Sequence, residues 1–194
     1  MTTMNPVAKR PRLYEPEDLL ALPDAVQYEL VDGILVEREM GSESSLIAVQ
    51  IILLLGQFLR GKKLAHVFGA DAGYQCFPDA PKKLRKGDVS VVLYGRFPDE
   101  KVPKGHTLIA PDLIVEVVSP RDLAEVVEAK VLEYLSAGVR LVWIVYPATR
   151  TVRIRRRVHA ATGPTTELAT TDSISGEDVL PGFTCRVSDF FEEV

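Results

Sequence analysis

The chain has 194 residues, of which 46% are hydrophobic and 26% charged, the composition of a globular protein and not of a disordered or fibrous one. Its 23 basic and 27 acidic side chains give a formal net charge of −4, which excludes a molecule-wide basic surface, so any polyanion site must be local. Cys76 and Cys185 lie far apart and form no CxxC pair, which favours reduced thiols in a cytoplasmic protein.

The first third of the chain predicts two helices and a hairpin. We expect no targeting segment, because the start "MTTMNPVAKRPRLYEP" lacks the apolar core of a signal peptide. Residues 16–22 predict a short helix, and the DG pair in "YELVDGILVERE" predicts a hairpin. Residues 42–61 predict a long helix, with Ser42 or a neighbouring serine as N-cap and Gly61 just past its end. This helix is apolar on more than one face but interrupted by polar residues, so we expect deep packing and no membrane span.

The rest of the chain predicts a mixed sheet. Strands are predicted at residues 64–69, 72–77, 88–95 and 112–119. A helix over 122–137 and a strand over 140–146 complete a right-handed βαβ unit, whose two strands are parallel and central. Residues 151–159 predict a more exposed strand, and residues 179–194 a strand and a short helix. The predicted fold class is therefore α/β, or α+β, around one mixed sheet.

Glu116 needs an explanation, because it stands inside the apolar run "PDLIVEVVSPRD". An unpaired carboxylate in a strand covered on both faces costs several kcal/mol, so the fold must supply a partner. In the following helix, apolar residues at three- and four-residue spacing mark the face that packs on the sheet: Leu123, Val126, Val127, Val131, Tyr134 and Leu135. Lys130 falls on that face and is the predicted partner of Glu116.

Two further carboxylates lead apolar runs of the same sheet, Asp88 before "VSVVLYG" and Glu29 in "YELV". Three carboxylates cannot ionise together in a dry cavity unless cations neutralise them, and hard oxygen ligands suit Mg²⁺ or Mn²⁺. Asp112 shares a strand face with Glu116, but it follows a proline and we favour a structural role. The pattern predicts a metal site among these carboxylates, with Lys130 orienting the nucleophile or neutralising the transition state.

These residues belong to a series of short motifs in a fixed order: "YELVDG", Asp88, "PDLIVEVVSP", "K...Y", "GV..VWIVYP" and "LPGF". In this order the chain resembles the Uma2 family, formerly a domain of unknown function. The resemblance covers the chain from about residue 14 to its end. It implies a tail over residues 1–13 and a single restriction endonuclease-like domain over residues 14–194, with a central mixed sheet, a long N-terminal helix and a βαβ crossover.

The resemblance also implies a PD-(D/E)XK nuclease core and assigns roles within it. Asp88 would be the aspartate and Glu116 the second acid. Lys130 would be the lysine, moved onto the following helix, and Glu29 the acid of an earlier element. Together they would form the catalytic set, with Asp88 and Glu116 as the metal ligands.

The chain departs from the usual family pattern at several positions. Gly87 stands where relatives have a proline before the aspartate, and Tyr146 where many have an aspartate. Val118 occupies the ordinary lysine position of the nuclease motif, and the shift of the lysine to the helix is normal in the family. Ser44 and Ser45 stand where the family often has a histidine.

Two functions are compatible with these patterns. The first is a metal-dependent endonuclease, a hydrolase that cleaves DNA phosphodiesters by in-line attack of a metal-activated water. The second is a catalytically silent nuclease-fold module that binds nucleic acid or protein. The basic runs "KKLRK" and "RIRRRVH" either contact DNA phosphates or form solvated faces, and we favour the solvated faces. We expect a cytoplasmic protein with no membrane partner, and a homodimer is compatible with both functions.

Overall fold

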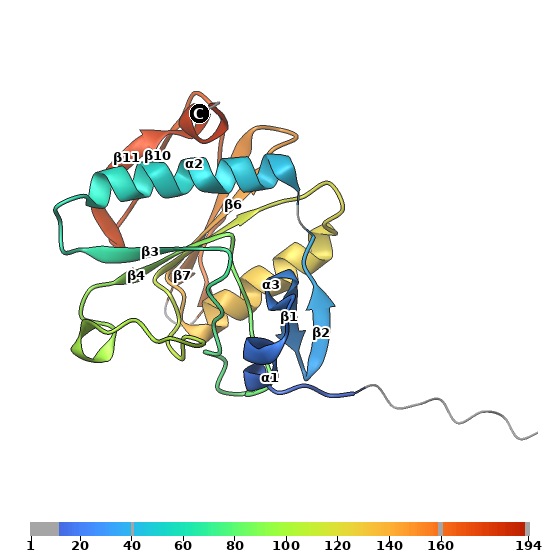
Figure 1. Ribbon diagram of the computed structural model, residues 1–194. Helices are drawn as coiled ribbons and strands as arrows, with labels where there is room; N and C mark the ends of the chain where they lie inside the picture. Colours follow the sequence, from blue (N-terminus) through green and yellow to red (C-terminus); the bar gives the residue numbers. More distant parts are fainter. Residues whose placement is uncertain (1–11, 40, 159–160, 193–194) are drawn as a thin grey trace, which may run out of the picture.

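The computed structural model describes residues 12–39, 41–158 and 161–192, so most of the predicted N-terminal tail lies outside the described residues. At its centre is a mixed sheet of seven strands (Figure 1). The long helices α2 (Ser42–Leu59) and α3 (Ala124–Ala137) cover opposite faces of this sheet. The arrangement confirms the predicted fold class.

The central sheet runs in the order β3, β4, β5, β6, β7 and β8, and β9 also pairs with β7. The strands are β3 (Ala65–Gly69), β4 (Val89–Leu93), β5 (Leu113–Val117), β6 (Leu141–Tyr146), β7 (Thr151–Val158), β8 (Ala161–Thr162) and β9 (Thr166–Leu168). β5 and β6 are parallel, whereas β3, β4 and β5 pair antiparallel, as do β6 and β7. Because α3 joins the parallel pair, the predicted βαβ unit is confirmed.

Two hairpins flank the central sheet. They are β1 (Tyr28–Val31) with β2 (Ile34–Glu37), and β10 (Ser173–Gly176) with β11 (Leu180–Arg186). Asp32 and Gly33 adopt positive φ of 52° and 81°, as the turn of a tight hairpin requires, so the DG signal is confirmed. The remaining helical segments are α1 (Pro16–Ala21) and the 3₁₀ turns Ala25–Gln27, Pro98–Glu100 and Val187–Phe191.

The two-residue period of β5 distributes its side chains between two cores. Leu113, Val115 and Val117 pack on the α2 side of the sheet, and Ile114 packs on the α3 side. Glu116 shares the face of Ile114 and therefore points toward α3. The alternation of the strand is what brings a carboxylate from a fully buried segment within reach of a helix.

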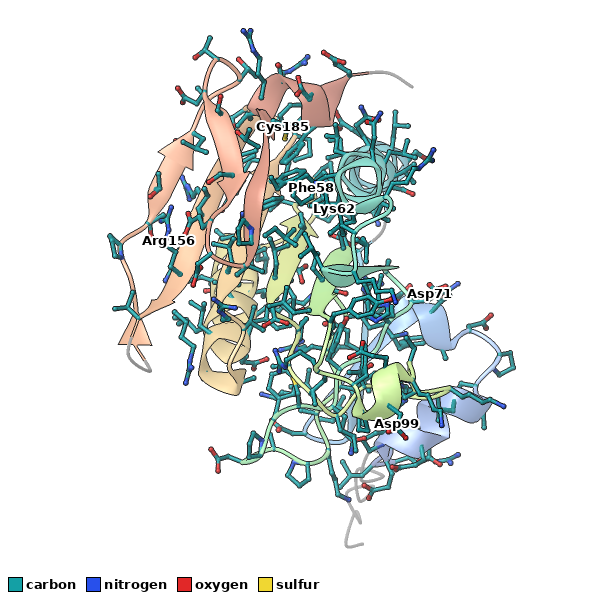
Figure 2. All side chains as sticks on the ribbon, turned by 90° about the vertical axis from the view of Figure 1, so that its left-hand side faces the viewer. Phe58, Lys62, Asp71, Asp99, Arg156 and Cys185 are labelled. Atoms are coloured by element: carbon teal, nitrogen blue, oxygen red, sulfur yellow. The ribbon has the colours of Figure 1, made fainter. Side chains whose placement is uncertain are left out.

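The β10–β11 hairpin closes the core on the α2 side. The ring of Phe58, near the end of α2, meets Phe183 of β11 edge-on with the ring centroids 5.4 Å apart, and Phe183 stacks on Trp143. Figure 2 shows Phe58 and Cys185 in this layer. Cys185 packs against this core whereas Cys76 belongs to the core on the α3 side, so the two free thiols lie on opposite faces of the sheet and do not pair.

The α2 helix differs from its prediction in two respects. Its N-cap is Gly41 and not a serine, although Gly61 follows the helix end in the expected left-handed conformation, with φ of 75°. The helix also buries one face only, because Ile51 and Leu55 are fully buried whereas other apolar residues are about half exposed: Leu46, Val49 and Leu53. By length and composition alone α2 could cross a membrane, but its buried face packs on the sheet as in the core helix of a folded domain.

A matched pair of leucines measures this one-sided burial. Leu55→Ala should lower the free energy of unfolding by about 2–5 kcal/mol, because it leaves a cavity in the core. Leu53→Ala should lower it by less than about 1 kcal/mol, because Leu53 is 49% exposed. Urea unfolding of both variants checks this, and equal losses would show that α2 is covered on both sides.

The strand predicted at residues 72–77 is wrong. Only Tyr74 of this segment forms β-bridges, one to Arg85 and one to Thr107. The segment meets each of two neighbouring segments at a single residue, so its apolar side chains pack without a continuous row of backbone hydrogen bonds to a neighbouring strand. The short strands β8, β9 and β10 were not predicted, since two to four residues carry too little periodicity.

Candidate functional site

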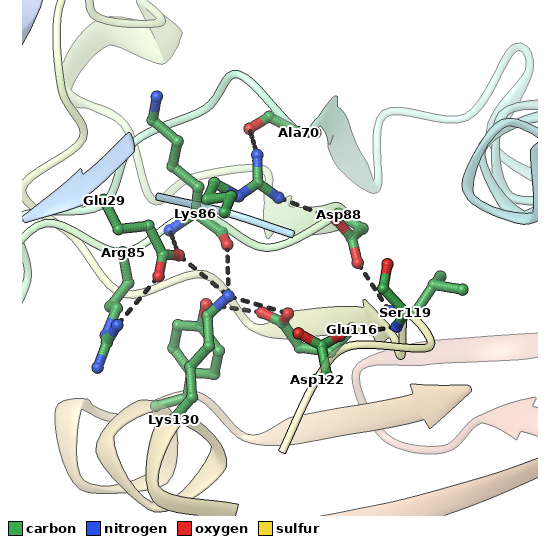
Figure 3. A network of polar contacts seen from close by, with 12 residues as sticks. Glu29, Ala70, Arg85, Lys86, Asp88, Glu116, Ser119, Asp122 and Lys130 are labelled. Carbon is green, nitrogen blue, oxygen red and sulfur yellow. Dashed lines mark hydrogen bonds and ion pairs between the residues drawn. The ribbon is translucent and has the colours of Figure 1, made fainter. Parts of the chain in front are cut away.

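The four residues predicted from the sequence meet in one cavity. Glu29, Asp88, Glu116 and Lys130 line a cavity of about 240 Å³ between the β1–β2 hairpin, the adjoining ends of β4 and β5, and the inner face of α3 (Figure 3). Glu29 comes from β1, Asp88 directly precedes β4, Glu116 lies in β5 and Lys130 in α3. Their predicted convergence is confirmed, although the strand of Glu29 belongs to the separate β1–β2 hairpin and not, as expected, to the central sheet.

Lys130 lies at the centre of this cluster. Its Nζ is 3.0 Å from Glu116 Oε2 and 3.0 Å from Glu29 Oε1, and it donates a hydrogen bond to the carbonyl of Lys86 at 3.1 Å. Its side chain is only 14% exposed, as the helical spacing predicted. The predicted face is wrong at its N-terminal end, where Leu123 and Val126 are exposed at the mouth of the cavity.

Glu116 is held by two donors. Lys130 bonds its Oε2, and the hydroxyl of the fully buried Tyr134 donates to Oε1 at 2.8 Å. Burial is the main influence on the carboxyl and raises the pKa of Glu116 to about 7, against the opposing effect of Lys130 and with a further contribution from the charges of Asp88 and Glu29. Near neutral pH this carboxyl therefore changes its charge readily when another cation approaches.

Glu29 has the opposite balance. Burial would raise the pKa of its carboxyl, but the charges of Lys130 and Arg85 together lower it, helped by the backbone N–H of Lys86. The Arg85 guanidinium lies 3.0 Å from Oε2, and the Lys86 amide donates to Oε1 at 2.7 Å. Glu29 is thus a fixed anion whose role in the site is to hold Lys130.

Asp88 completes the set at the other side of the cavity. Its Oδ2 accepts a hydrogen bond from the backbone N–H of Val117 at 2.7 Å, which fixes it to the end of β5. Its Oδ1 is 2.9 Å from the guanidinium of Arg38, which also donates to the carbonyl of Ala70 at 3.0 Å. The Asp88 side chain is 24% exposed, so it is the most accessible of these three carboxylates.

Two site residues, Arg38 and Arg85, were missed in the sequence. Arg85 belongs to the run "KKLRK", in which only its charge was considered, and Arg38 lies in the hairpin strand "ILVERE" without a distinguishing pattern. With Lys130 they give three cations against the three carboxylates. The cations that the three carboxylates require are therefore supplied at least in part by side chains of the protein.

Asp112 lies outside the cavity. It is buried at the start of β5, where it accepts a hydrogen bond from the amide of Leu93 at 2.9 Å and pairs with Arg96 at 2.7 Å. These contacts fit the structural role favoured from the sequence.

The basic runs are largely paired with acidic side chains. On β7, Arg153 pairs with Glu167, Arg155 with Glu128 and Arg156 with Glu177, while Lys83 and Arg85 share Glu133. Figure 2 shows Arg156 on the opposite side of the view from Asp71. His159, at the end of the second run, lies outside the described residues. The pairings leave little free charge for a phosphate. The solvated faces favoured from the sequence are wrong for Lys83, Arg85 and Arg155, whose side chains are largely buried in these pairs.

The carboxylate oxygens in the cavity fit a divalent cation that keeps part of its water shell. Among the described residues, no three His, Cys, Asp or Glu side chains are grouped closely enough to hold a metal ion by themselves. Mg²⁺ usually binds one or two carboxylates and completes its octahedron with water and substrate oxygens. Asp88 and Glu116 supply two such carboxylates on one cavity.

Known proteins relate this chain to nucleases. A solved structure described as a "putative nuclease belonging to DUF820 from Anabaena variabilis ATCC 29413" matches with a TM-score of 0.75 and 20% identity, over 91% of this chain and 97% of that one. At this identity the likeness shows a shared fold. No curated protein matches the chain. The Uma2 family, described as "Putative restriction endonuclease", matches residues 16–188. Because this match spans most of the sequence, the chain belongs to the Uma2 family.

Proposed function

We propose that the protein is a metal-dependent endonuclease that hydrolyses phosphodiester bonds in DNA through a PD-(D/E)XK-type site. The observation that carries the proposal is the meeting of Asp88, Glu116 and Lys130 in one cavity, although they come from three different elements. The family description and the nuclease-like fold of its structural relative support this choice.

The protein groups divide the work of hydrolysis among them. Asp88 and Glu116 would hold Mg²⁺ or Mn²⁺, which when bound supplies charge neutralisation at the phosphoryl group and activation of water. Lys130 lies 3.0 Å from Glu116, where its ammonium can orient the attacking water and stabilise negative charge on the phosphate. Glu29 holds that ammonium in place from its other side.

The lysine reaches the site by a different path from that of the usual motif. Val118, two residues after Glu116 and directly past the end of β5, has an apolar side chain, so no cation is available at the ordinary position. About two turns into α3, Lys130 supplies the cation from the helix that packs on the sheet. The helix anchors the ammonium through the buried neighbours Val131 and Tyr134, which suits a group that must keep a fixed position.

Titration calorimetry with Mn²⁺ tests whether the cavity binds a divalent cation, as the proposed mechanism requires. We expect one ion to bind per chain and to raise the melting temperature, and we expect Mn²⁺ or Mg²⁺ to support cleavage of DNA, with RNA of the same sequence cut more slowly. Binding without cleavage of either nucleic acid would remove the enzymatic part of the proposal. Cleavage that persists in excess EDTA would remove the metal.

One observation favours a second function. Lys130 pairs directly with Glu116, and three cations balance the three carboxylates, so the cluster is also a stable set of ion pairs. Such a cluster could serve a catalytically silent module that binds nucleic acid or protein. The calorimetry separates the two functions, because the silent module requires no Mn²⁺ binding at this cavity.

A further inference from the structure

Arg38 lies where two cavities meet. The first is the 240 Å³ cavity of the candidate site, and the second, of about 510 Å³, extends along the first turns of α2 past Ser44 and Ser45. Arg38 and Asp88 line both cavities. A group that spans both can contact a ligand that extends beyond the reacting centre.

The guanidinium of Arg38 is tightly placed. It is anchored at the carbonyl of Ala70 and at Asp88 Oδ1, and the side chain is only 8% exposed. These two contacts use two of the five N–H groups of a guanidinium. Since the other oxygen of Asp88 is bound to the amide of Val117, Arg38 is the cation that pairs with this carboxylate.

We propose that Arg38 is the counterion of Asp88 in the metal-free protein and becomes the phosphate-binding residue once a divalent cation takes over Asp88. The proposal rests on the proposed nuclease function and extends it to the way the substrate is held. Arg38 would bind a non-bridging oxygen of a DNA phosphodiester at the border of the two cavities.

Arg38 and an incoming metal ion compete for the carboxylate of Asp88. A guanidinium 2.9 Å from Oδ1 lowers the free energy of the ionised carboxylate, and an incoming metal ion must replace that interaction. The Arg38 charge also repels the incoming cation, and a combined cost of about 1.4 kcal/mol weakens binding tenfold. Arg38 should therefore weaken metal binding by about tenfold or more.

Once displaced from Asp88, the guanidinium of Arg38 is available to a phosphate. Its anchor at the Ala70 carbonyl does not involve a carboxylate, so the group can stay in the cavity when Asp88 turns to the metal. It remains charged, because arginine does not lose its proton in proteins, and its planar fork matches phosphate oxygens. Four cations and six carboxylates line the cavity, so a divalent cation changes the formal charge of the lining from negative to neutral and removes the repulsion of an entering phosphodiester.

The first test compares Arg38→Met with Arg121→Met in Mn²⁺ titration calorimetry. Methionine keeps most of the buried stem of the arginine and removes its charge. Arg121 lines the same cavity, but its side chain is 84% exposed and lies 3.9 Å from Glu39, not at Asp88. We expect Arg38→Met to bind Mn²⁺ about tenfold more tightly than wild type and Arg121→Met to stay within about threefold.

The second test measures binding of a short DNA duplex in EDTA and in Ca²⁺, with a gel to confirm that the DNA stays intact. In EDTA, Arg38 is engaged with Asp88, so Arg38→Met should bind DNA about as wild type does. In Ca²⁺ the variant should bind about tenfold more weakly than wild type. Arg121→Met should show the same change, if any, under both conditions.

Several results would overturn the proposal. Unchanged or weaker Mn²⁺ binding by Arg38→Met, or equal strengthening in Arg121→Met, would show that Arg38 does not compete at Asp88. An equal loss of DNA affinity in EDTA and in Ca²⁺ would show that Arg38 does not change its partner from Asp88 to a phosphate.

If wild type binds Mn²⁺ and cleaves DNA, these results leave the nuclease function intact. If neither wild type nor Arg38→Met binds Mn²⁺, both proposals fail. Should Arg38→Met not fold, Arg38→Lys is tested instead. Its gain in Mn²⁺ affinity should be smaller than that of Arg38→Met, because the lysine ammonium keeps the charge but reaches only one of the two acceptors, Asp88 and the Ala70 carbonyl.

Discussion

Asp88→Asn and Glu116→Gln should each lower Mn²⁺-dependent DNA cleavage by a factor of about 10³ or more while leaving the protein folded. Each change removes one of the two carboxylates available to the cation, and the loss of either leaves too few protein ligands to hold it. Cleavage of plasmid DNA in Mn²⁺, beside thermal melts in EDTA, measures the two effects separately.

The amide variants isolate the metal more cleanly than alanine. Asp88→Ala and Glu116→Ala should also abolish cleavage, but they remove the carboxylate partner of Arg38 or one of the two carboxylate partners of Lys130, and breaking a buried pair costs about 3–5 kcal/mol. Asn and Gln keep an oxygen that accepts a hydrogen bond, and Gln removes the negative charge of Glu116, which burial disfavours. We therefore expect the amide variants to melt within a few degrees of wild type.

Asp122→Asn is the matched control. Asp122 lines the same cavity, but its carboxylate caps the backbone N–H of Ser119 at 2.7 Å, a contact that asparagine can replace. Its cleavage rate should stay within about threefold of wild type, because it ligates nothing in the proposed mechanism. Wild-type cutting by Asp88→Asn or Glu116→Gln would remove that residue from the metal site, whatever the melts show.

The part of the site that could be predicted depends on local periodicity. Strand alternation turns Glu116 toward α3, and helical spacing turns Lys130 toward the sheet, so each orientation follows from a few neighbouring residues. Asp88 was recognised because it opens an apolar strand. For these residues the order of the elements along the chain was enough to bring the groups together.

The missed residues depend on contacts between distant segments. Arg85 reaches Glu29 because Leu30 of the first hairpin pairs through its backbone with Leu84, a bridge between segments with no recognisable common pattern. Arg38 reaches Asp88 because the hairpin strand continues past β2 toward the loop at Ala70. No window of sequence contains both partners of these pairs, so propensity and periodicity carry no information about them.

The error at α2 has a related cause. Apolar residues on several faces indicate that a helix is covered, but they do not say by what, and this structure covers one face only. The same limit applies to the metal. Three buried carboxylates indicate that cations are needed, yet the number of cations supplied by the protein appears only when Arg38, Arg85 and Lys130 are seen in place.

Lys130→Met should lower DNA cleavage by about 10³-fold and leave Mn²⁺ binding intact. Methionine retains most of the buried aliphatic stem but removes the ammonium that lies 3.0 Å from both Glu29 and Glu116. Because both carboxylates that would hold the cation remain, and a competing charge has gone, calorimetry should show Mn²⁺ binding at least as tight as in wild type. Loss of cleavage with retained binding is the signature of a group that acts on the reacting phosphate.

The same variant separates catalysis from structure. In EDTA, Lys130→Met should lose about 3–5 kcal/mol of stability, because two buried carboxylates lose their shared cation, and Mn²⁺ should restore part of it by binding the folded state. Lys83→Met is the control: its side chain is 13% exposed against 14% for Lys130, and it pairs with Glu133 outside the cavity. Lys83→Met should lose stability without losing cleavage. If Lys130 is only structural, its variant will resemble Lys83→Met and Mn²⁺ will restore nothing, and an unchanged melting temperature with full cleavage would exclude Lys130 from the site.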